Sequence, residues 1–306
     1  MKILVTGGAG FIASHIVDAY VDQGHEVVVI DNLSSGKEEN INPKAKFYKM
    51  DIRDEKVDDL FAQNQFDVVN HHAAQMDVRR SVADPAFDAQ VNVLGTINLL
   101  QSSVKHKISK FIFSSTGGAV YGEQEYFPAD ETHPTWPISP YGITKLTCEK
   151  YLFYYKEVFN LPHVIFRYSN VYGPRQSPHG EAGVVAIFSK LLLNGEQPTI
   201  NGSGKQTRDY VYVGDLVRIN VMALAHDRSD VFNVGTSVET DVNELFHLLN
   251  RFTDAGKEEF HGPEKAGEQL RSCILCKKAE DLLGWKAEVD LNAGLQKTVE
   301  FFRNEN

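Results

Sequence analysis

The residues best suited to acid–base chemistry are a tyrosine and a lysine four positions apart, Tyr141 and Lys145. Residues four apart lie on one face of a helix, so the phenol and the ammonium would be neighbours. A phenol has an ordinary pKa near 10, and an adjacent positive charge favours the phenolate and lowers that pKa. The pair therefore predicts a tyrosine that acts as a base toward a hydroxyl group. An ordinary amphipathic helix with a surface lysine is the alternative.

Three small hydroxyl residues, Ser114, Ser115 and Thr116, follow the apolar run 111–113. Such a run predicts a buried strand, and ligands bind beyond the carboxyl ends of the strands in open α/β sheets. We expect one of these hydroxyls to donate to the reacting oxygen or to pass a proton to Tyr141. At least one of the others is expected to cap backbone groups.

A glycine-rich turn, Gly7-Gly8-Ala9-Gly10-Phe11-Ile12-Ala13, follows a predicted strand (3–5) and opens a predicted helix (11–23). Glycines permit a tight turn and close approach of the backbone to a pyrophosphate, which the helix N-terminus attracts. Asp31 ends the next predicted strand, where a carboxylate can bind ribose hydroxyls and would repel a 2′-phosphate. The expected cofactor is NAD, whose positive nicotinamide ring would further favour the phenolate of Tyr141.

Asp51 and Ile52 follow the third predicted strand and could meet the adenine edge of the dinucleotide. For Asp51 a helix-capping role is the alternative.

Short apolar runs alternate with helical patterns through the first half of the chain. This alternation predicts an α/β fold: a Rossmann-type doubly wound parallel sheet with a smaller C-terminal substrate-binding lobe. We expect an NAD-binding domain over residues 1–172 and a substrate lobe over 173–306, interleaved with the first. Strands are predicted at 3–5, 27–30, 46–50, 67–70, 110–114 and 163–168. Helices are predicted at 11–23, 57–63, 85–104, 141–159, 184–194, 213–225, 243–254 and 292–304.

The formal net charge of −10 argues against nucleic acid or an anionic membrane surface as the main partner. No apolar run approaches the ~18 residues of a membrane span. Three cysteines, an odd count, suit a reducing compartment, so we expect a cytoplasmic protein. Cys273 and Cys276 have CxxC spacing without a second pair or a histidine cluster, and no metal site is predicted.

The chain resembles an extended short-chain dehydrogenase/reductase of the NAD-dependent epimerase/dehydratase family. Within that family it is most similar to 4-epimerases of UDP-sugars, the UDP-glucose/UDP-galactose type. The resemblance covers essentially the whole chain. The motifs that carry it are Thr6–Ile12, His72–Gln75, Ser114–Gly122, Ser139–Lys145, Arg167–Gly173 and Arg208–Val211.

The resemblance implies a role for each matching residue. Tyr141 would be the base, Lys145 its partner on the nicotinamide ribose, and Thr116 or Ser115 the catalytic hydroxyl. The expected NAD-binding residues are Gly7, Gly10, Phe11, Ile12, Asp31, Asn32, Ser35, Gly36, Asp51, Ile52, Ala73, Ala74, Gln75, Asn92, Ser114, Tyr141, Lys145 and Tyr168. The expected substrate-binding residues are Thr116, Tyr141, Asn170, Arg208, Glu268 and Arg271.

The segment 265–268 departs from the family pattern, because Lys265 stands where an arginine is usual. A lysine offers a point charge instead of a bidentate fork, and Arg271 is near enough in sequence to compensate. Glu268 would reach the uridine ribose. Ser272 matches a position that limits the space beside the 2-substituent of the sugar, which would admit an N-acetyl group. An exposed surface serine is the alternative.

Members of the family that eliminate water or carbon dioxide usually carry an acidic residue just after the catalytic hydroxyl residue. Here Gly117-Gly118-Ala119 follows Thr116, which favours epimerisation of a UDP-sugar by transient oxidation at C4, rotation of the 4-keto sugar and hydride return. A nucleotide-sugar dehydratase or decarboxylase and a non-catalytic NAD-binding regulator are the alternatives. The apolar helical stretches 92–104 and 141–159, with the family resemblance, favour a homodimer; burial under a neighbouring helix in a monomer is the alternative.

Overall fold

The computed structural model describes residues 1–178, 183–265 and 269–305, and it divides the chain into two compact units. The first unit comprises Met1–Gly122, Thr135–Arg167 and Val217–Phe232, and the second comprises Glu123–Pro134, Tyr168–Leu216 and Asn233–Asn306. Each unit is assembled from separate stretches of chain. The division into residues 1–172 and 173–306 stays a prediction.

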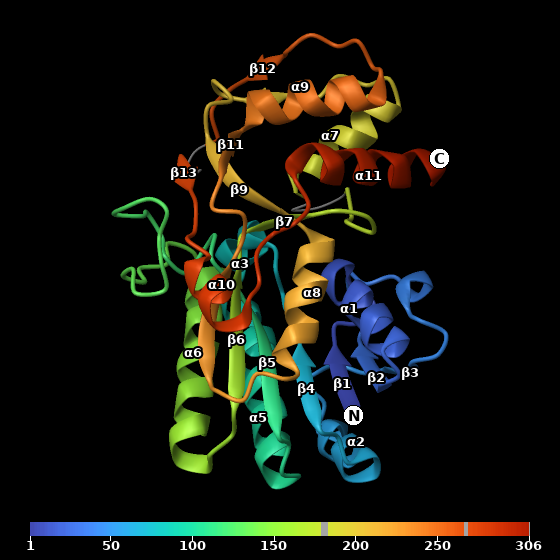
Figure 1. The fold of residues 1–306 in the computed structure, drawn as a ribbon, viewed down its shortest axis with the longest axis vertical. Coiled ribbons are helices and arrows are strands. Elements are labelled where there is room, and N and C mark those ends of the chain that lie inside the picture. The colour runs from blue at the N-terminus through green and yellow to red at the C-terminus, as the bar shows by residue number, and fades with distance from the viewer. Residues whose placement is uncertain (179–182, 266–268, 306) are drawn as a thin grey trace. The chain divides into compact units, whose positions relative to one another are not determined.

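The first unit is built around a seven-stranded sheet in the order β10-β6-β5-β4-β1-β2-β3 (Figure 1). This is the doubly wound order of the Rossmann fold with one further strand, so the predicted fold class is confirmed. The glycine-rich turn follows β1 of this sheet. Strands β1 to β5 pair in parallel; the apolar runs of β1, β2, β4 and β5 are buried, whereas Phe47 and Tyr48 of β3 are half-buried. The strands are β1 (Lys2–Thr6), β2 (Glu26–Asp31), β3 (Lys46–Lys49), β4 (Val68–His71), β5 (Lys110–Thr116), β6 (His163–Tyr168) and β10 (Asp230–Val234).

The stretch predicted as one helix over 85–104 is not a continuous α-helix. A π-helical turn, Gln90–Leu94, separates α4 (Pro85–Ala89) from α5 (Gly95–Lys105). Such turns are frequent at functional sites, and hydrophobic periodicity does not reveal them. The other helices of the first unit are α1 (Phe11–Asp22), α2 (Lys56–Asn64), α3 (Val78–Ala83) and α6 (Pro140–Phe159), with a 3₁₀ turn at Glu38–Asn40. Helix α8 (Val213–Ala223) follows β9 along the chain.

The second unit has its own apolar core and a small sheet in which β9 (Thr207–Tyr212) is central. Strand β9 pairs with β11 (Glu239–Asp241), β13 (Arg271–Ser272) and β7 (Asn170–Tyr172). Strand β8 (Ile200–Asn201) pairs with β12 (His261–Gly262). The helices of this unit are α7 (Val184–Leu193), α9 (Val242–Thr253), α10 (Lys277–Leu283) and α11 (Leu291–Asn304).

Cys148, Cys273 and Cys276 are free thiols. Among residues 1–178, 183–265 and 269–305, no group of three or more histidine, cysteine or acidic side chains is arranged to hold a metal ion. Within the same ranges, every helix is too short or too polar to cross a membrane.

Candidate active site

The glycine turn brings the backbone against the end of β4. Gly7 has φ of +71°, and a Cβ there would lie 2.7 Å from the backbone nitrogen of Ala73. The amide of Gly10 donates to the Gly7 carbonyl at 2.9 Å, and Ser14 makes the first amide bond of α1, back to Gly10. The amides of Phe11 and Ile12 therefore precede the first helical bond, and the helix N-terminus can receive an anionic pyrophosphate.

Asp31 ends β2 and is already tied to the loops around it. Its carboxylate accepts the backbone amides of Ala9 at 3.0 Å and Leu33 at 2.7 Å. Gly36 packs over the glycine turn, since a Cβ there would lie 2.8 Å from the Ala9 Cβ. Asn32 donates to Asp51 at 2.8 Å, and Ser35 lies between these loop positions. The loop after β2 is thus shaped around the turn, and each carboxylate oxygen of Asp31 keeps a second lone pair for a hydroxyl.

Asp51 does not cap α2, whose N-cap is Glu55. Its carboxylate instead binds the guanidinium of Arg53 through two bonds of 2.8 Å and accepts from the Arg53 backbone amide. These bonds hold the pKa of Asp51 below its ordinary value. Ile52 is buried directly beneath Gly95, where a Cβ would lie 2.5 Å from the Ile52 Cδ1. The capping alternative for Asp51 is wrong, and its contact with adenine stays a prediction.

Tyr141 and Lys145 lie in the first two turns of α6. Ser139 caps the helix by accepting the Gly142 amide at 3.1 Å, and Pro140 occupies the first helical position. The Tyr141 amide donates to the buried Ser81 hydroxyl on α3 at 3.2 Å. The Lys145 ammonium donates to the Ser114 carbonyl at 2.8 Å and lies 6.0 Å from the centre of the Tyr141 ring. The predicted pair is therefore adjacent to the end of β5.

Burial dominates the electrostatics of this pair. Burial raises the pKa of the Tyr141 phenol above its ordinary value, and the negative charge of Asp88 raises it further. Burial also lowers the pKa of the Lys145 ammonium to about 8, partly offset by nearby negative groups such as Asp88 and Glu149. In the chain itself, burial and the charge of Asp88 both disfavour the phenolate. The predicted lowering of the phenol pKa rests on Lys145 together with the positive nicotinamide ring of NAD, and it stays a prediction.

The hydroxyls at the end of β5 alternate between the two faces of the strand. Ser115 is buried and donates to the Glu149 carboxylate at 2.5 Å. Ser114 and Thr116 are half-buried and share the opposite face, since side chains alternate along a strand. Ser115 is therefore occupied in an internal bond, while Thr116 lies on the same side as Ser114, the residue whose carbonyl holds Lys145.

A buried ion pair supports this arrangement. Arg167 on β6 donates to both oxygens of Glu149 at 3.0 and 2.6 Å, and to the Tyr121 hydroxyl at 3.0 Å. Glu149 follows Lys145 by one helical turn. This pair was not among the predicted site residues. The signal was a carboxylate four positions from the lysine on an otherwise apolar helix face.

Gln75 and Asn92, both predicted to bind NAD, bond to each other in two places. The backbone amide of Gln75 donates to the side-chain oxygen of Asn92 at 2.8 Å, and the side-chain amide of Asn92 donates to the backbone carbonyl of Gln75 at 2.9 Å. Both side chains also donate to the buried carboxylate of Asp88. Ala73 and Ala74 lie between β4 and Gln75, and the Ala73 amide donates to Thr6 at the end of β1.

The second unit holds the remaining predicted residues that the structure describes. Arg208 on β9 is opposite Ser272 on β13, and Asn170 is opposite Tyr210. Arg208, Asn170 and Ser272 therefore share one face of the small sheet. Ser272 is buried, so the alternative of an exposed surface serine is wrong. Tyr168 ends β6 and is buried, Lys265 is exposed, and Glu268 lies outside the described residues.

Arg271 lies on the opposite face from Arg208, because its partner in register is Thr207. Its guanidinium binds both oxygens of Glu239 at 2.9 and 2.6 Å and stacks 3.9 Å from the centre of the Phe127 ring. The described contacts of Arg271 thus link β13 to β11 and to Phe127. Its role as a diphosphate ligand stays a prediction.

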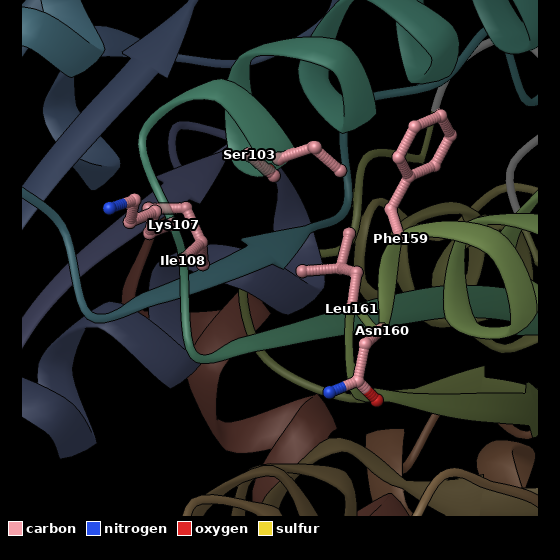
Figure 2. Close-up of a pocket in the computed structure, with 7 residues that line it drawn as sticks. Ser103, Lys107, Ile108, Phe159, Asn160 and Leu161 are labelled. Atoms are coloured by element: carbon pink, nitrogen blue, oxygen red, sulfur yellow. The ribbon is translucent and has the colours of Figure 1, made fainter.

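A shallow cavity of about 210 Å³ lies in the first unit, where α5 and α6 end. Figure 2 shows Ser103 and Lys107 on one side and Phe159 and Leu161 on the other. Tyr141 begins α6, so this cavity and the predicted catalytic tyrosine are at opposite ends of one 20-residue helix. The cavity lining includes none of the predicted site residues.

Comparison with known proteins agrees with this geometry. The sequence pattern of the NAD dependent epimerase/dehydratase family matches residues 3–235. The UDP-glucose 4-epimerase of Mycolicibacterium smegmatis is 45% identical over 313 aligned positions, covering 100% of both chains. The crystal structure of a Thermotoga maritima UDP-glucose 4-epimerase with UDP-glucose is 49% identical, with a TM-score of 0.98 over 100% of this chain and 99% of that one.

A second solved structure is a complex with the cofactor. The Thermus thermophilus UDP-glucose 4-epimerase, in complex with NAD, is 42% identical, with a TM-score of 0.93 over 99% of both chains. These matches support NAD as the cofactor, and the roles of the glycine turn, Asp31 and the Tyr141–Lys145 pair stay predictions. The chain belongs to the NAD-dependent epimerase/dehydratase family.

Proposed function

We propose that this protein is an NAD-dependent 4-epimerase of UDP-sugars, of the UDP-glucose/UDP-galactose type. The observation that carries the proposal is the Tyr141–Lys145 pair, held by the bond from Lys145 to Ser114 beside the strand end that presents Thr116. The residues after Thr116 are glycine, glycine and alanine. Elimination of water needs a further acid or base, whereas epimerisation needs only a base, a hydroxyl and room for the sugar to turn.

Bound NAD supplies a reversible acceptor for the hydride of the sugar carbon. The residues of this chain handle the proton. Tyr141, as phenolate, accepts the proton of the C4 hydroxyl, and the Lys145 ammonium stabilises that phenolate. Thr116 donates to the same oxygen. Ser115 is committed to Glu149, so we assign the sugar-facing hydroxyl to Thr116.

The same proton then returns to the C4 oxygen after the sugar has turned its other face. For this to occur the nucleotide must stay bound while the sugar is loosely held. We propose that Asn170 and Arg208, on one face of the small sheet, hold the diphosphate. Arg208 offers a planar fork of donors suited to phosphate oxygens.

The first experiment compares wild-type protein with Tyr141→Phe on a panel of UDP-sugars, with products identified by NMR and mass. The variant should retain NAD and lose about 10²–10⁴-fold in kcat, because general base catalysis contributes that much. Wild-type product of unchanged mass and inverted C4 supports epimerisation. A product lighter by water or carbon dioxide would instead support a dehydratase or decarboxylase. Near wild-type turnover by Tyr141→Phe would overturn the assignment.

A matched pair of variants tests the choice between the two hydroxyls. Thr116→Ala should lower kcat by at least about tenfold with little change in stability. Ser115→Ala removes a buried bond to Glu149 and should lower the unfolding free energy by about 1–2 kcal/mol with a smaller effect on kcat. The opposite pattern would assign the sugar-facing role to Ser115.

The small side chain of Ser272 leads us to propose that N-acetylated UDP-sugars are also accepted. Ser272 shares its sheet face with Arg208. Ser272→Tyr should abolish turnover of UDP-N-acetylglucosamine and preserve that of UDP-glucose. Equal loss on both substrates would contradict this role.

We further propose a homodimer and a cytoplasmic location. Helix α6 leaves Phe153, Tyr154, Val158 and Phe159 exposed, an apolar patch typical of an interface between subunits. Light scattering should give twice the chain mass, and Phe153→Glu should give the monomer. A monomeric wild-type protein would refute the dimer. The three free thiols favour a reducing compartment, which fractionation of the source cells would test.

A further inference from the structure

We propose that Asp88 is a positioning residue for the Tyr141–Lys145 pair. In this proposal its carboxylate couples the residues predicted to line NAD to helix α6 and places a fixed negative charge beside the pair. The inference rests on the proposed role of Tyr141. It goes beyond that role, because it explains what keeps the Tyr141 phenolate basic enough to accept the proton of the sugar hydroxyl.

Asp88 is completely buried on α4, and three side chains donate to its carboxylate. Gln75 donates at 2.9 Å and Asn92 at 3.2 Å to one oxygen, and the Thr144 hydroxyl donates at 2.6 Å to the other. Thr144 precedes Lys145 directly. A single carboxylate therefore joins the loop after β4, the π-helical turn and the catalytic helix.

All three of these donors are neutral, so they satisfy the oxygens of Asp88 without cancelling its charge. A buried charge acts over a longer range than one in water, because the surroundings screen it weakly. Neutral hydrogen-bond donors make the carboxylate tolerable in the interior. The arrangement keeps a negative charge close to α6 where a neutral side chain of similar shape, asparagine, would fit.

The charges around the pair come from several elements. On α6 itself Lys145 and Glu149 are charged, and Glu149 is paired with Arg167 of β6. Cys148 is a neutral thiol, because burial raises its pKa to about 11. From α4 comes Asp88. His71 and His72 face Lys145 from the end of β4, and burial together with that lysine lowers the pKa of both, so both are neutral at neutral pH.

Among these groups the charge of Asp88 acts on both members of the pair. It raises the pKa of the Tyr141 phenol and also that of the Lys145 ammonium. A tyrosine that takes a proton and later returns it must not be too acidic, or its phenolate is too weak a base to accept the proton in the first transfer. Lys145 favours the phenolate and Asp88 favours the phenol, so the two opposed charges set the balance that a reversible transfer needs.

The test uses NAD-loaded protein labelled at the tyrosine ring carbon that bears the hydroxyl. The NMR signal of Tyr141 is assigned by its absence in Tyr141→Phe and followed with pH. In D88N we expect its titration midpoint to fall by roughly one pH unit, and the acid limb of kcat to shift with it. The control D58N removes one charge from α2, where Asp58 pairs with Lys105 and His106, and should leave the midpoint unchanged.

The variant T144V separates geometry from charge, because it removes one donor to Asp88 and leaves the carboxylate. It should lower kcat about fivefold, the effect of one hydrogen bond, without moving the midpoint. A midpoint in folded D88N equal to that of wild type would overturn the proposal. So would an equal shift in D58N. If D88N does not fold, D88S is titrated in its place, since a water can replace the carboxylate there. A lower Tyr141 midpoint in D88S supports the proposal, and a midpoint equal to that of wild type overturns it.

The NMR titration needs no turnover. If the panel of UDP-sugars shows no epimerisation, the proposed function fails while the effect of Asp88 on Tyr141 can still be observed.

Discussion

Removing Arg167 while keeping Glu149 should destabilise the protein strongly, because the two side chains form a buried ion pair. Their exposed fractions are 7% and 4%, and the pair makes two bonds of 2.6 and 3.0 Å. In R167M the Ser115 hydroxyl would be the one donor left to the carboxylate among the described residues. Loss of one partner of a buried pair typically costs about 3–5 kcal/mol, since the remaining charge stays in the interior unpaired.

For a chain of this length, that loss corresponds to a fall in Tm of about 6–10 °C. Urea unfolding followed by circular dichroism measures the free energy directly. The double variant E149L/R167M removes both charges, and we expect it to recover at least about half of the loss, because hydrophobic replacement of a buried pair is often nearly neutral. Recovery is not complete, because the Ser115 hydroxyl has then lost the carboxylate that accepts its hydrogen bond.

Two results would refute this reasoning. The first is a loss below about 1 kcal/mol in R167M, the range typical of exposed pairs. The second is a double variant whose loss equals the sum of the two single losses, since that would mean that the pair has no coupling energy. Either result would show that water reaches Glu149 in solution.

Three further predictions concern NAD binding, stability in acid and the reactivity of the Cys148 thiol. Gly7→Ala should weaken NAD binding at least tenfold, because φ is +71° and the added Cβ would lie 2.7 Å from the Ala73 nitrogen. Calorimetric titration measures the NAD affinity. Gly24→Ala is the control for backbone strain alone, since Gly24 also has a positive φ but has open space around it. Burial lowers the pKa of His163 to about 4 and that of His71 well below its ordinary value, so the unfolded chain binds more protons below about pH 6.5 and stability falls as pH drops toward these folded values. His163 should account for about 2 kcal/mol between pH 7.5 and 5, and His71 should contribute a loss in the same direction. His163→Gln should remove the His163 share, and an unchanged pH slope in the variant would contradict this. Cys148, buried and with its pKa raised to about 11, should resist alkylation at pH 8 until the protein unfolds, and rapid labelling of the native protein would disprove its burial.

Much of the first unit could be predicted because its elements have clear local patterns. A run such as 27–30 is apolar at every position, which is typical of a strand buried on both faces. Helix α6 has a capping serine, a proline at its first position and 20 residues of helical pattern. Helices α3 and α10, of six and seven residues, were missed because so few residues give too little periodicity. The two-residue strands of the second unit were missed for the same reason.

The site could be predicted only as far as its motifs reach. Tyr141, Lys145 and the glycine turn are recognisable by spacing, whereas the partners of Ser115 and Asp88 come from elements 34 and 56 positions away. Which of two adjacent hydroxyls faces inward depends on the register of β5, which its sequence does not state. The same holds for Arg208 and Arg271, which register places on opposite faces of one sheet.

The π-helical turn at Gln90–Leu94 makes the site depend on the number of residues as well as on their identity. Such a turn contains one residue more than the α-helix it interrupts. Since each residue of an α-helix rotates the chain by about 100°, deleting one residue there would restore a regular helix and swing α4 around its axis relative to α5. Asp88 would then point away from Thr144, although every side chain named in the site would still be present. Homologous chains should therefore tolerate substitutions at the exposed positions of this turn far better than a change of length.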